Sequence, residues 1–253
     1  MRFVTPRRPE PTLADLFYAM TIHPGEVQIA LPRLLPLRKA DKPPSPSCID
    51  EAVIHVAHAA IFDAGCVVYG GFLRDWVVRG ETANDVDVRT SDYDATEQAM
   101  NTALQEFGIN CSGSQPWGQN KTFRRLQSTW QGNAIDVDLV NPSLVPSTPP
   151  GVDCDVGNLQ LDKHNGLQLK VPRLGQHVSL AKSVKHCMSK KFVLFYDPSG
   201  SEPAGRRLKK YIERGWICIS HVPDDVASRL GLSTEQLKPK QKYLETFWKA
   251  PEM

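Results

Sequence analysis

The chain has 253 residues, of which 41% are hydrophobic and 23% charged, and its formal net charge is +2. This composition is typical of a globular protein with a sizeable core, and the near-neutral balance excludes a polybasic coat for nucleic acid. No apolar run approaches the roughly 18 residues that a membrane-spanning helix requires, and the first residues lack the apolar stretch of a secretory signal. Six scattered cysteines without a CxxC pair favour reduced thiols, so we expect a cytoplasmic protein with no membrane partner.

Three parts follow one another along the chain. Nine prolines in residues 1–47 block long helices and central strands, which predicts an extended N-terminal arm with one short helix near Thr12–Met20. Residues 48–175 alternate between helical and strand patterns, and residues 176–253 are helical and locally basic. The pattern predicts an α+β (α/β) fold, in which a mixed β-sheet is flanked by helices and followed by a helical C-terminal region.

The expected elements follow from periodicity and from turn residues. In chain order they are a helix from Ser47 to Gly65, a strand Cys66–Tyr69, a short helix Phe72–Arg79, a strand Asp85–Arg89, a helix Tyr93–Phe107, a β-hairpin over 121–140, a second hairpin over 156–170, helices at about 176–191 and 201–214, a strand after Gly215, and two helical pieces between 222 and 248.

Gly70 and Gly71 lie between an expected strand and an expected helix. Glycines at such a place permit positive φ angles and let a ligand approach the backbone, while the exposed N–H groups of the helix start suit a phosphate. A tight turn alone would also explain a pair of glycines, and it is the commoner explanation.

Two expected strands carry alternating aspartates. Asp85 and Asp87 share one face of the first strand, and Asp136 and Asp138 share one face of "AIDVDLV", with apolar residues on the other face of each. Neighbouring carboxylates repel each other, and Mg²⁺ held by carboxylates and substrate phosphates relieves that repulsion. One such strand would most simply be a solvated edge, but two together favour a two-metal site for phosphoryl transfer.

The stretch "GGFLRDWVVRGETANDVDV" resembles the head-domain signature of the polymerase-β-type nucleotidyltransferases. It is most similar to the branch that contains class II CCA-adding tRNA nucleotidyltransferases and bacterial poly(A) polymerases. That signature has a glycine pair, an Arg-Asp pair two residues later, a short helix ending in Arg-Gly, and then DxD. The resemblance extends over residues 67–140 and implies a nucleotidyltransferase-type sheet with residues 48–175 as the catalytic domain.

The resemblance also implies roles for individual residues. Gly70 and Gly71 would cradle the nucleoside triphosphate, and Arg74 would either lie near the phosphates or brace the loop against Asp75. The remaining implied site residues are Asp85 and Asp87 as ligands of two Mg²⁺ ions, for which Mn²⁺ could substitute, Asp138 or else Asp136 as the third, catalytic carboxylate near the attacking hydroxyl, and Lys182 and Lys185 on a helix that reaches the triphosphate.

The implied activity is transfer of an NMP from an NTP to an acceptor hydroxyl. Nine Lys and Arg residues within 181–215 favour an RNA 3′ end as the acceptor. A protein or a small molecule is the alternative acceptor, and a non-catalytic nucleotide- or RNA-binding relative and a plain structural domain are the alternative classes. The chain has no counterpart to the later motif with which the tRNA-specific branch selects CTP or ATP, so the base stays open.

Two further patterns have competing interpretations. Asp153 and Asp155 form another DxD, which is either structural or part of the active site. His186 and Cys187 would suit a zinc site only together with distant partners.

Overall fold

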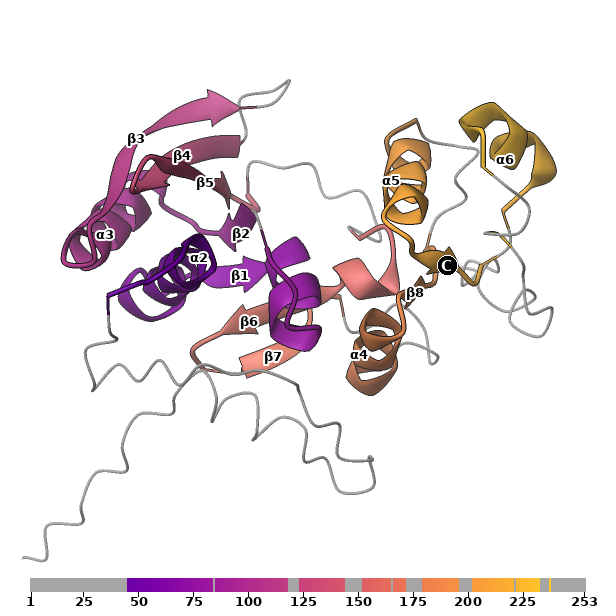
Figure 1. The fold of residues 1–253 in the computed structure, drawn as a ribbon, viewed down its shortest axis with the longest axis horizontal. Helices are drawn as coiled ribbons and strands as arrows, with labels where there is room; N and C mark the ends of the chain where they lie inside the picture. Colours follow the sequence, from indigo (N-terminus) through magenta and orange to yellow (C-terminus); the bar gives the residue numbers. More distant parts are fainter. Residues whose placement is uncertain are drawn as a thin grey trace, which may run out of the picture.

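The structure is a computed structural model that describes residues 45–83, 85–117, 123–143, 152–164, 166–171, 179–195, 202–220, 222–232 and 237. Most of the expected N-terminal arm, including the helix near Thr12–Met20, lies outside the described residues, as does the chain after residue 237. The described part is a mixed sheet flanked by helices with a helical C-terminal region, which confirms the predicted fold class (Figure 1).

A seven-stranded sheet forms the centre of the described residues, in the order β3-β4-β5-β2-β1-β6-β7. β2 and β5 are parallel, whereas the other neighbouring strands are antiparallel. The strands are β1 Val67–Tyr69, β2 Asp85–Arg89, β3 Ile109–Trp117, β4 Phe123–Trp130, β5 Asn133–Val140, β6 Leu159–Asp162 and β7 Gly166–Leu169. Both predicted hairpins are present, as β4–β5 and β6–β7.

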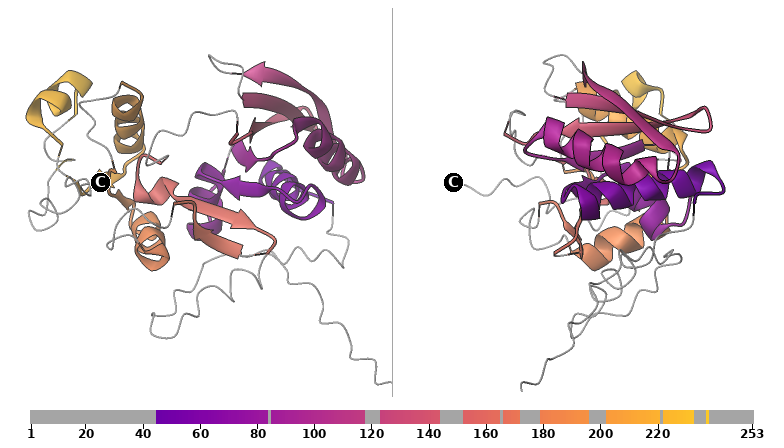
Figure 2. Two further views of the ribbon diagram at one scale, coloured as in Figure 1. Left: turned by 180° about the vertical axis from the view of Figure 1, so that it is seen from behind. Right: turned by 90° about the vertical axis from the view of Figure 1, so that its left-hand side faces the viewer.

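α2 and α3 pack against this sheet, whereas α4, α5 and α6 gather beyond it around a small second sheet (Figures 1 and 2). The helices are α2 Ile49–His58, its π-helical continuation η1 Ala59–Asp63, the π-helix η2 Leu73–Val78, α3 Tyr93–Gln105, the short 3-10 helix η3 Asp155–Gly157, α4 Leu180–Met188, α5 Glu202–Glu213 and α6 Asp224–Leu230. A two-stranded parallel sheet, β8 Lys191–Phe192 with β9 Ile217–Cys218, separates the C-terminal helices.

One face of the sheet is apolar and covered by the first helices. Val68, Val86, Val88 and Val137 are fully buried on this face, and α2 and α3 pack against β2 and β3. Because side chains alternate along a strand, the residues between these valines point to the opposite face. That opposite face carries the aspartates of β2 and β5.

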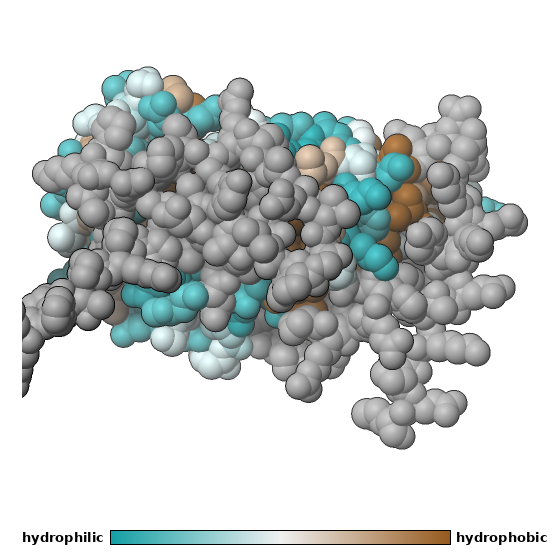
Figure 3. All heavy atoms as spheres, turned by 90° about the horizontal axis from the view of Figure 1, so that it is seen from below, coloured by the Kyte–Doolittle hydropathy of each residue, from teal (hydrophilic) through white to brown (hydrophobic). Residues whose placement is uncertain are grey.

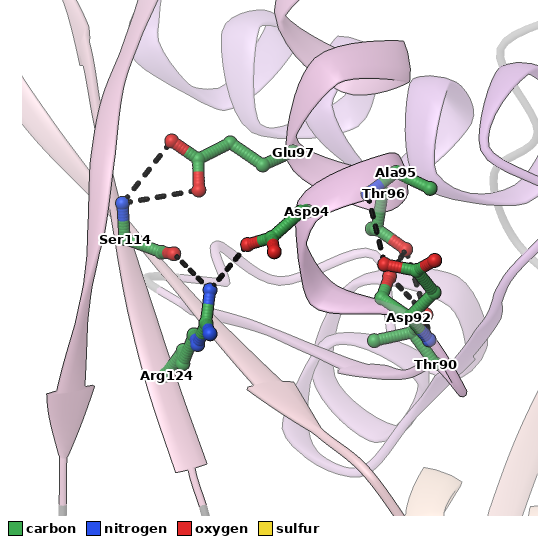
Figure 4. A network of polar contacts seen from close by, with 8 residues as sticks. All are labelled: Thr90, Asp92, Asp94, Ala95, Thr96, Glu97, Ser114 and Arg124. Atoms are coloured by element: carbon green, nitrogen blue, oxygen red, sulfur yellow. Dashed lines mark hydrogen bonds and ion pairs between the residues drawn. The ribbon is translucent and has the colours of Figure 1, made fainter.

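Polar contacts hold α3 against the sheet (Figure 4). The side chain of Asp92 accepts a hydrogen bond from the N–H of Ala95 and caps the helix N-terminus. Arg124 of β4 donates to Asp94 over 2.6 Å. Arg124 therefore points to the helix-covered face, away from the aspartates of β5.

The C-terminal region shares the core of the sheet domain. Leu208, Tyr211 and Trp216 are buried in the same apolar cluster as Leu73 and Val77 of η2. Seen from below, described residues present a largely hydrophilic surface, with an apolar area toward the C-terminal side (Figure 3). No helix among the described residues combines the length and the apolar character needed to cross a membrane.

Candidate active site

Four aspartates lie side by side on the face of the sheet that α2 and α3 leave uncovered. Because β2 and β5 are parallel, Asp85 lies beside Asp136 and Asp87 lies beside Asp138. The sequence predicted that each pair shares a face. The structure adds the register that brings the two pairs together.

Asp87 is an aspartate of this site with a clearly raised pKa. Burial is the largest cause that raises the pKa of Asp87 to about 7, and the negative charges of Asp85 and Asp138 add to it. The N–H of Gly71 donates a hydrogen bond to this carboxylate and acts in the opposite direction. A carboxylate whose pKa is shifted in this way is common at functional sites.

The two aspartates of β5 differ in depth. The side chain of Asp138 is 16% exposed, and that of Asp136 is 48% exposed. Asp138 is also the one whose charge acts on Asp87. Its depth and its neighbour make Asp138 the better candidate for a third carboxylate.

The glycine turn lies directly against the aspartates of β2. Gly70 has φ +76, and a Cβ atom there would lie 2.5 Å from Oδ2 of Asp87. A Cβ atom at Gly71 would lie 3.5 Å from Oδ1 of Asp85, which is an ordinary contact. The turn needs glycine at position 70 because both the backbone angle and the adjoining carboxylate exclude a side chain.

Arg125 of β4 binds the aspartates of β5. Its Nε donates to Oδ1 of Asp138 over 2.7 Å and its Nη2 to Oδ2 over 2.9 Å, while Nη1 donates to Asp136 over 3.2 Å. Such a two-pronged pair is among the stronger side-chain interactions. Arg125 is not among the predicted site residues, although counting back from the turn at Gln131 and Gly132 places it opposite Asp138.

The donor set fits a divalent cation in part. No three His, Cys, Asp or Glu side chains within the described ranges are arranged to hold a metal ion. Asp85 and Asp87 supply the oxygen ligands that Mg²⁺ prefers, and a cation would relieve the repulsion that raises the pKa of Asp87. Both oxygens of Asp138 accept from Arg125, so this guanidinium competes with a cation for Asp138 as a third ligand.

Arg74 follows the glycine turn and contacts residues of the C-terminal region. This buried guanidinium pairs with Asp75, donates from Nη1 to the hydroxyl of Tyr211 over 2.7 Å, and lies over the ring of Trp216 at 5.4 Å. The sequence left two roles open for Arg74, and its contacts are those of the bracing role. The partners on α5 and before β9 are far away in the sequence, so no local pattern indicates them.

The two lysines expected to reach a triphosphate are exposed on α4. This helix packs against η2, η3 and β8, and Ser179 caps it by accepting from the N–H of Lys182. A C-terminal cation whose charge acts on Asp87 is instead Arg207 of α5. Arg207 belongs to the basic stretch 181–215, and no local pattern indicates its place near the aspartates.

Asp155 has a structural role. It is buried, accepts hydrogen bonds from the N–H groups of Val156 and Val193, and pairs with Nδ1 of His186. These bonds tie η3 to α4 and β8, so the structural interpretation of this aspartate is confirmed. Asp153, the other acid of that motif, pairs with Arg207.

Comparison with known proteins gives a distant likeness. No protein-family model matches the chain, and no curated protein sequence matches it either. Among solved structures the chain is similar to a tRNA-processing enzyme in its apo form I, with 13% identity over 73% of this chain and 46% of that one and a TM-score of 0.41. It is similar to a tRNA-processing enzyme in apo form 2 with 10% identity over 71% of this chain and 46% of that one, at a TM-score of 0.36. The chain thus spans less than half the length of these structures.

Proposed function

We propose that the protein is a nucleotidyltransferase that depends on Mg²⁺ and moves an NMP from an NTP to an acceptor hydroxyl, with an RNA 3′ end as the acceptor. The observation that carries the proposal is the register of β2 with β5, which sets Asp87 beside Asp138 under the turn of Gly70 and Gly71. A carboxylate of raised pKa is common at functional sites, and clustered carboxylates can hold the metal ions of phosphoryl transfer.

In the proposed reaction the acceptor oxygen forms a bond to the α-phosphorus while the bond to the leaving pyrophosphate breaks. A bound divalent cation would supply neutralisation of the phosphate charge. We assign the proton of the attacking hydroxyl to Asp138, the neighbour of Asp87 on β5, and Arg125 competes with that proton for the Asp138 oxygens. The backbone of the glycine turn is the part of the chain that approaches these carboxylates without a side chain in between.

The test is a labelling assay with the full chain. The protein is incubated with Mg²⁺ or Mn²⁺, each α-labelled NTP in turn, and total RNA, tRNA or cell protein. We expect label in RNA, and we expect the Asp85→Asn/Asp87→Asn protein to leave RNA unlabelled. Asp94→Asn is the matched control, because it removes a carboxylate from α3 on the helix-covered face. Label in protein alone would contradict an RNA acceptor, and NTP binding without any transfer would favour a non-catalytic binding domain.

Replacing Arg125 by alanine is expected to strengthen divalent metal binding. The change frees both oxygens of Asp138, so Mn²⁺ should bind about tenfold more tightly, in line with the loss of one competing charge-assisted pair. Calorimetric titration with Mn²⁺ measures this. The adjacent Arg124→Ala protein is the control, since Arg124 pairs with Asp94 on the other face. Equal or weaker Mn²⁺ binding by the Arg125→Ala protein would contradict the prediction.

Metal binding is also expected to depend on pH. Asp87 has a pKa of about 7 in the metal-free protein, so it is mostly protonated below that pH and must lose a proton to bind a cation. The Mn²⁺ affinity should therefore fall as pH drops below 7, by at most about tenfold per pH unit, and level off above it. Titrations between about pH 6 and pH 8 in buffers of different ionisation enthalpy would measure the affinity and the released proton. A constant Mn²⁺ affinity between about pH 6 and pH 8 would contradict this prediction.

A further inference from the structure

A second group of charges lies beside the aspartates, on the same face of the sheet. Tyr69 of β1 is the neighbour of Asp87 in the sheet register, and Gln160 of β6 is the neighbour of Tyr69 on its other side. Three cations from separate elements gather around this pair, and we call them the Tyr69 cation group: Arg89 at the end of β2, Lys170 just after β7, and Arg207 on α5.

Two of the cations contact residues that are neighbours on adjoining strands. Nζ of Lys170 lies 4.9 Å from the ring centre of Tyr69. Nη1 of Arg89 donates to Oε1 of Gln160 over 3.0 Å. Since Gln160 and Tyr69 are paired in register, both cationic side chains lie at the same level of the sheet as Asp87.

The third cation comes from the C-terminal region. Arg207 pairs with Asp153, and its charge acts on Asp87 and on Tyr69. Its side chain is 59% exposed, so it is within reach of a ligand from solvent.

The three cations repel one another, and nearby carboxylates offset part of this repulsion. Burial and the positive charge of Arg89 lower the pKa of Lys170, while the carboxylates of Asp153 and Asp87 act in the opposite direction. Cations that repel each other in a partly buried place stabilise an anion placed between them. Arginine and lysine together are the usual partners of phosphate oxygens.

We propose that the Tyr69 cation group is a phosphate-binding site next to the carboxylates. The inference rests on the proposed nucleotidyl transfer for the source of the phosphate, which is either the nucleotide or the backbone of the acceptor RNA. In this proposal Arg89, Lys170 and Arg207 bind the phosphate, whereas the family resemblance implies Lys182 and Lys185 of α4 for that role.

The test measures binding without turnover, in a chelator-containing buffer, with two probes. One probe is inorganic tripolyphosphate, followed by calorimetry, and the other is a fluorescent single-stranded RNA with a free 3′ hydroxyl, followed by polarisation at several salt concentrations. Lys170→Met keeps most of the aliphatic stem over Tyr69 and removes the charge. Arg207→Gln removes the second charge, and Arg206→Gln, adjacent on the exposed part of α5, is the matched control.

We expect Lys170→Met and Arg207→Gln each to weaken the binding of at least one probe by about tenfold. Arg206→Gln should weaken it by less than about twofold. Weaker tripolyphosphate binding identifies the nucleotide as the source. Weaker RNA binding, with the salt slope reduced by about 0.7 for each lost phosphate contact, identifies the acceptor. Lys170→Arg should restore binding, which separates the charge from a folding defect.

The inference is overturned if Lys170→Met and Arg207→Gln bind both probes as well as Arg206→Gln does. It is also overturned if the wild-type protein binds neither probe. Either result leaves the labelling assay intact, because label transfer depends on Asp85 and Asp87. Conversely, absence of transfer with every NTP would overturn the proposed function even where the cation group binds phosphate.

Discussion

The Asp87→Asn protein is expected to lose NMP transfer and, without metal, to be more stable than the wild type above pH 7. Activity should fall by at least about a thousandfold if Asp87 binds the metal as proposed, because the variant then loses several kcal/mol of charge stabilisation. Stability should rise because the wild-type carboxylate is ionised where burial and the charges of Asp85 and Asp138 oppose ionisation. The amide oxygen of asparagine can still accept from the N–H of Gly71.

The sign of the pH dependence follows from the raised pKa. An acid with a pKa of about 7 in the folded protein binds a proton more tightly than the ordinary acid of the unfolded chain, whose pKa is 3.8. Folded stability is therefore lost as pH rises from about 4 to 7, and the loss is complete above 7. It amounts to at most roughly 4 kcal/mol. The advantage of Asp87→Asn should be largest at about pH 8 and should shrink toward pH 5.

Thermal unfolding at these two pH values measures the effect, with an expected gain of several degrees at the higher pH. Asp138→Asn is an informative comparison, since it also removes a carboxylate but breaks the two-pronged pair with Arg125. It should bring no gain. A lower Tm of Asp87→Asn at about pH 8 would show that this carboxylate is not under electrostatic strain.

Gly70→Ala is expected to abolish most of the transfer activity and to destabilise the protein. The new Cβ atom would lie 2.5 Å from Oδ2 of Asp87, so the carboxylate must turn away from its position beside Asp138. The backbone at φ +76 adds about 1–2 kcal/mol of conformational strain. We expect transfer to fall by about a hundredfold or more, since misplacement by about 1 Å has such effects.

Alanine at two other glycines distinguishes backbone strain from displacement of the Asp87 carboxylate. Gly108 has φ +68, but a Cβ atom there would meet nothing within 4 Å, so Gly108→Ala should share the strain and keep its activity. Gly71→Ala makes only ordinary contacts and should be milder than Gly70→Ala. Label transfer and thermal unfolding of the three proteins provide the comparison. Equal activity of Gly70→Ala and Gly108→Ala would exclude a special role for the turn.

Local patterns in the sequence account for the parts of the site that lie close together in the chain. Alternation predicted that Asp136 and Asp138 share one face of a hairpin strand, and β5 confirms this. The glycine pair between a strand and a helix is likewise found where the pattern indicated. These features depend on side-chain periodicity and turn chemistry, which act within a few residues.

Contacts between distant segments could not be predicted in the same way. The parallel pairing of β2 with β5 follows from how α3, β3 and β4 pack, and β3 itself has no clear alternation. The burial of Arg74 requires Tyr211 and Trp216, which fold back onto η2 from the C-terminal region. Tertiary packing decides such positions, and a single sequence contains no local signal for it.

The parallel pairing of β2 and β5 also has a consequence for the order of folding. The whole segment of α3, β3 and β4 separates the two strands in the chain, so their pairing closes a long loop, whereas the β4–β5 hairpin closes locally. We therefore expect the hairpin to form first. Arg125 and Asp138 belong to the two strands of that hairpin and pair with each other. If the hairpin forms before it docks beside β2, the pair of Arg125 with Asp138 is already in place when the two strands meet.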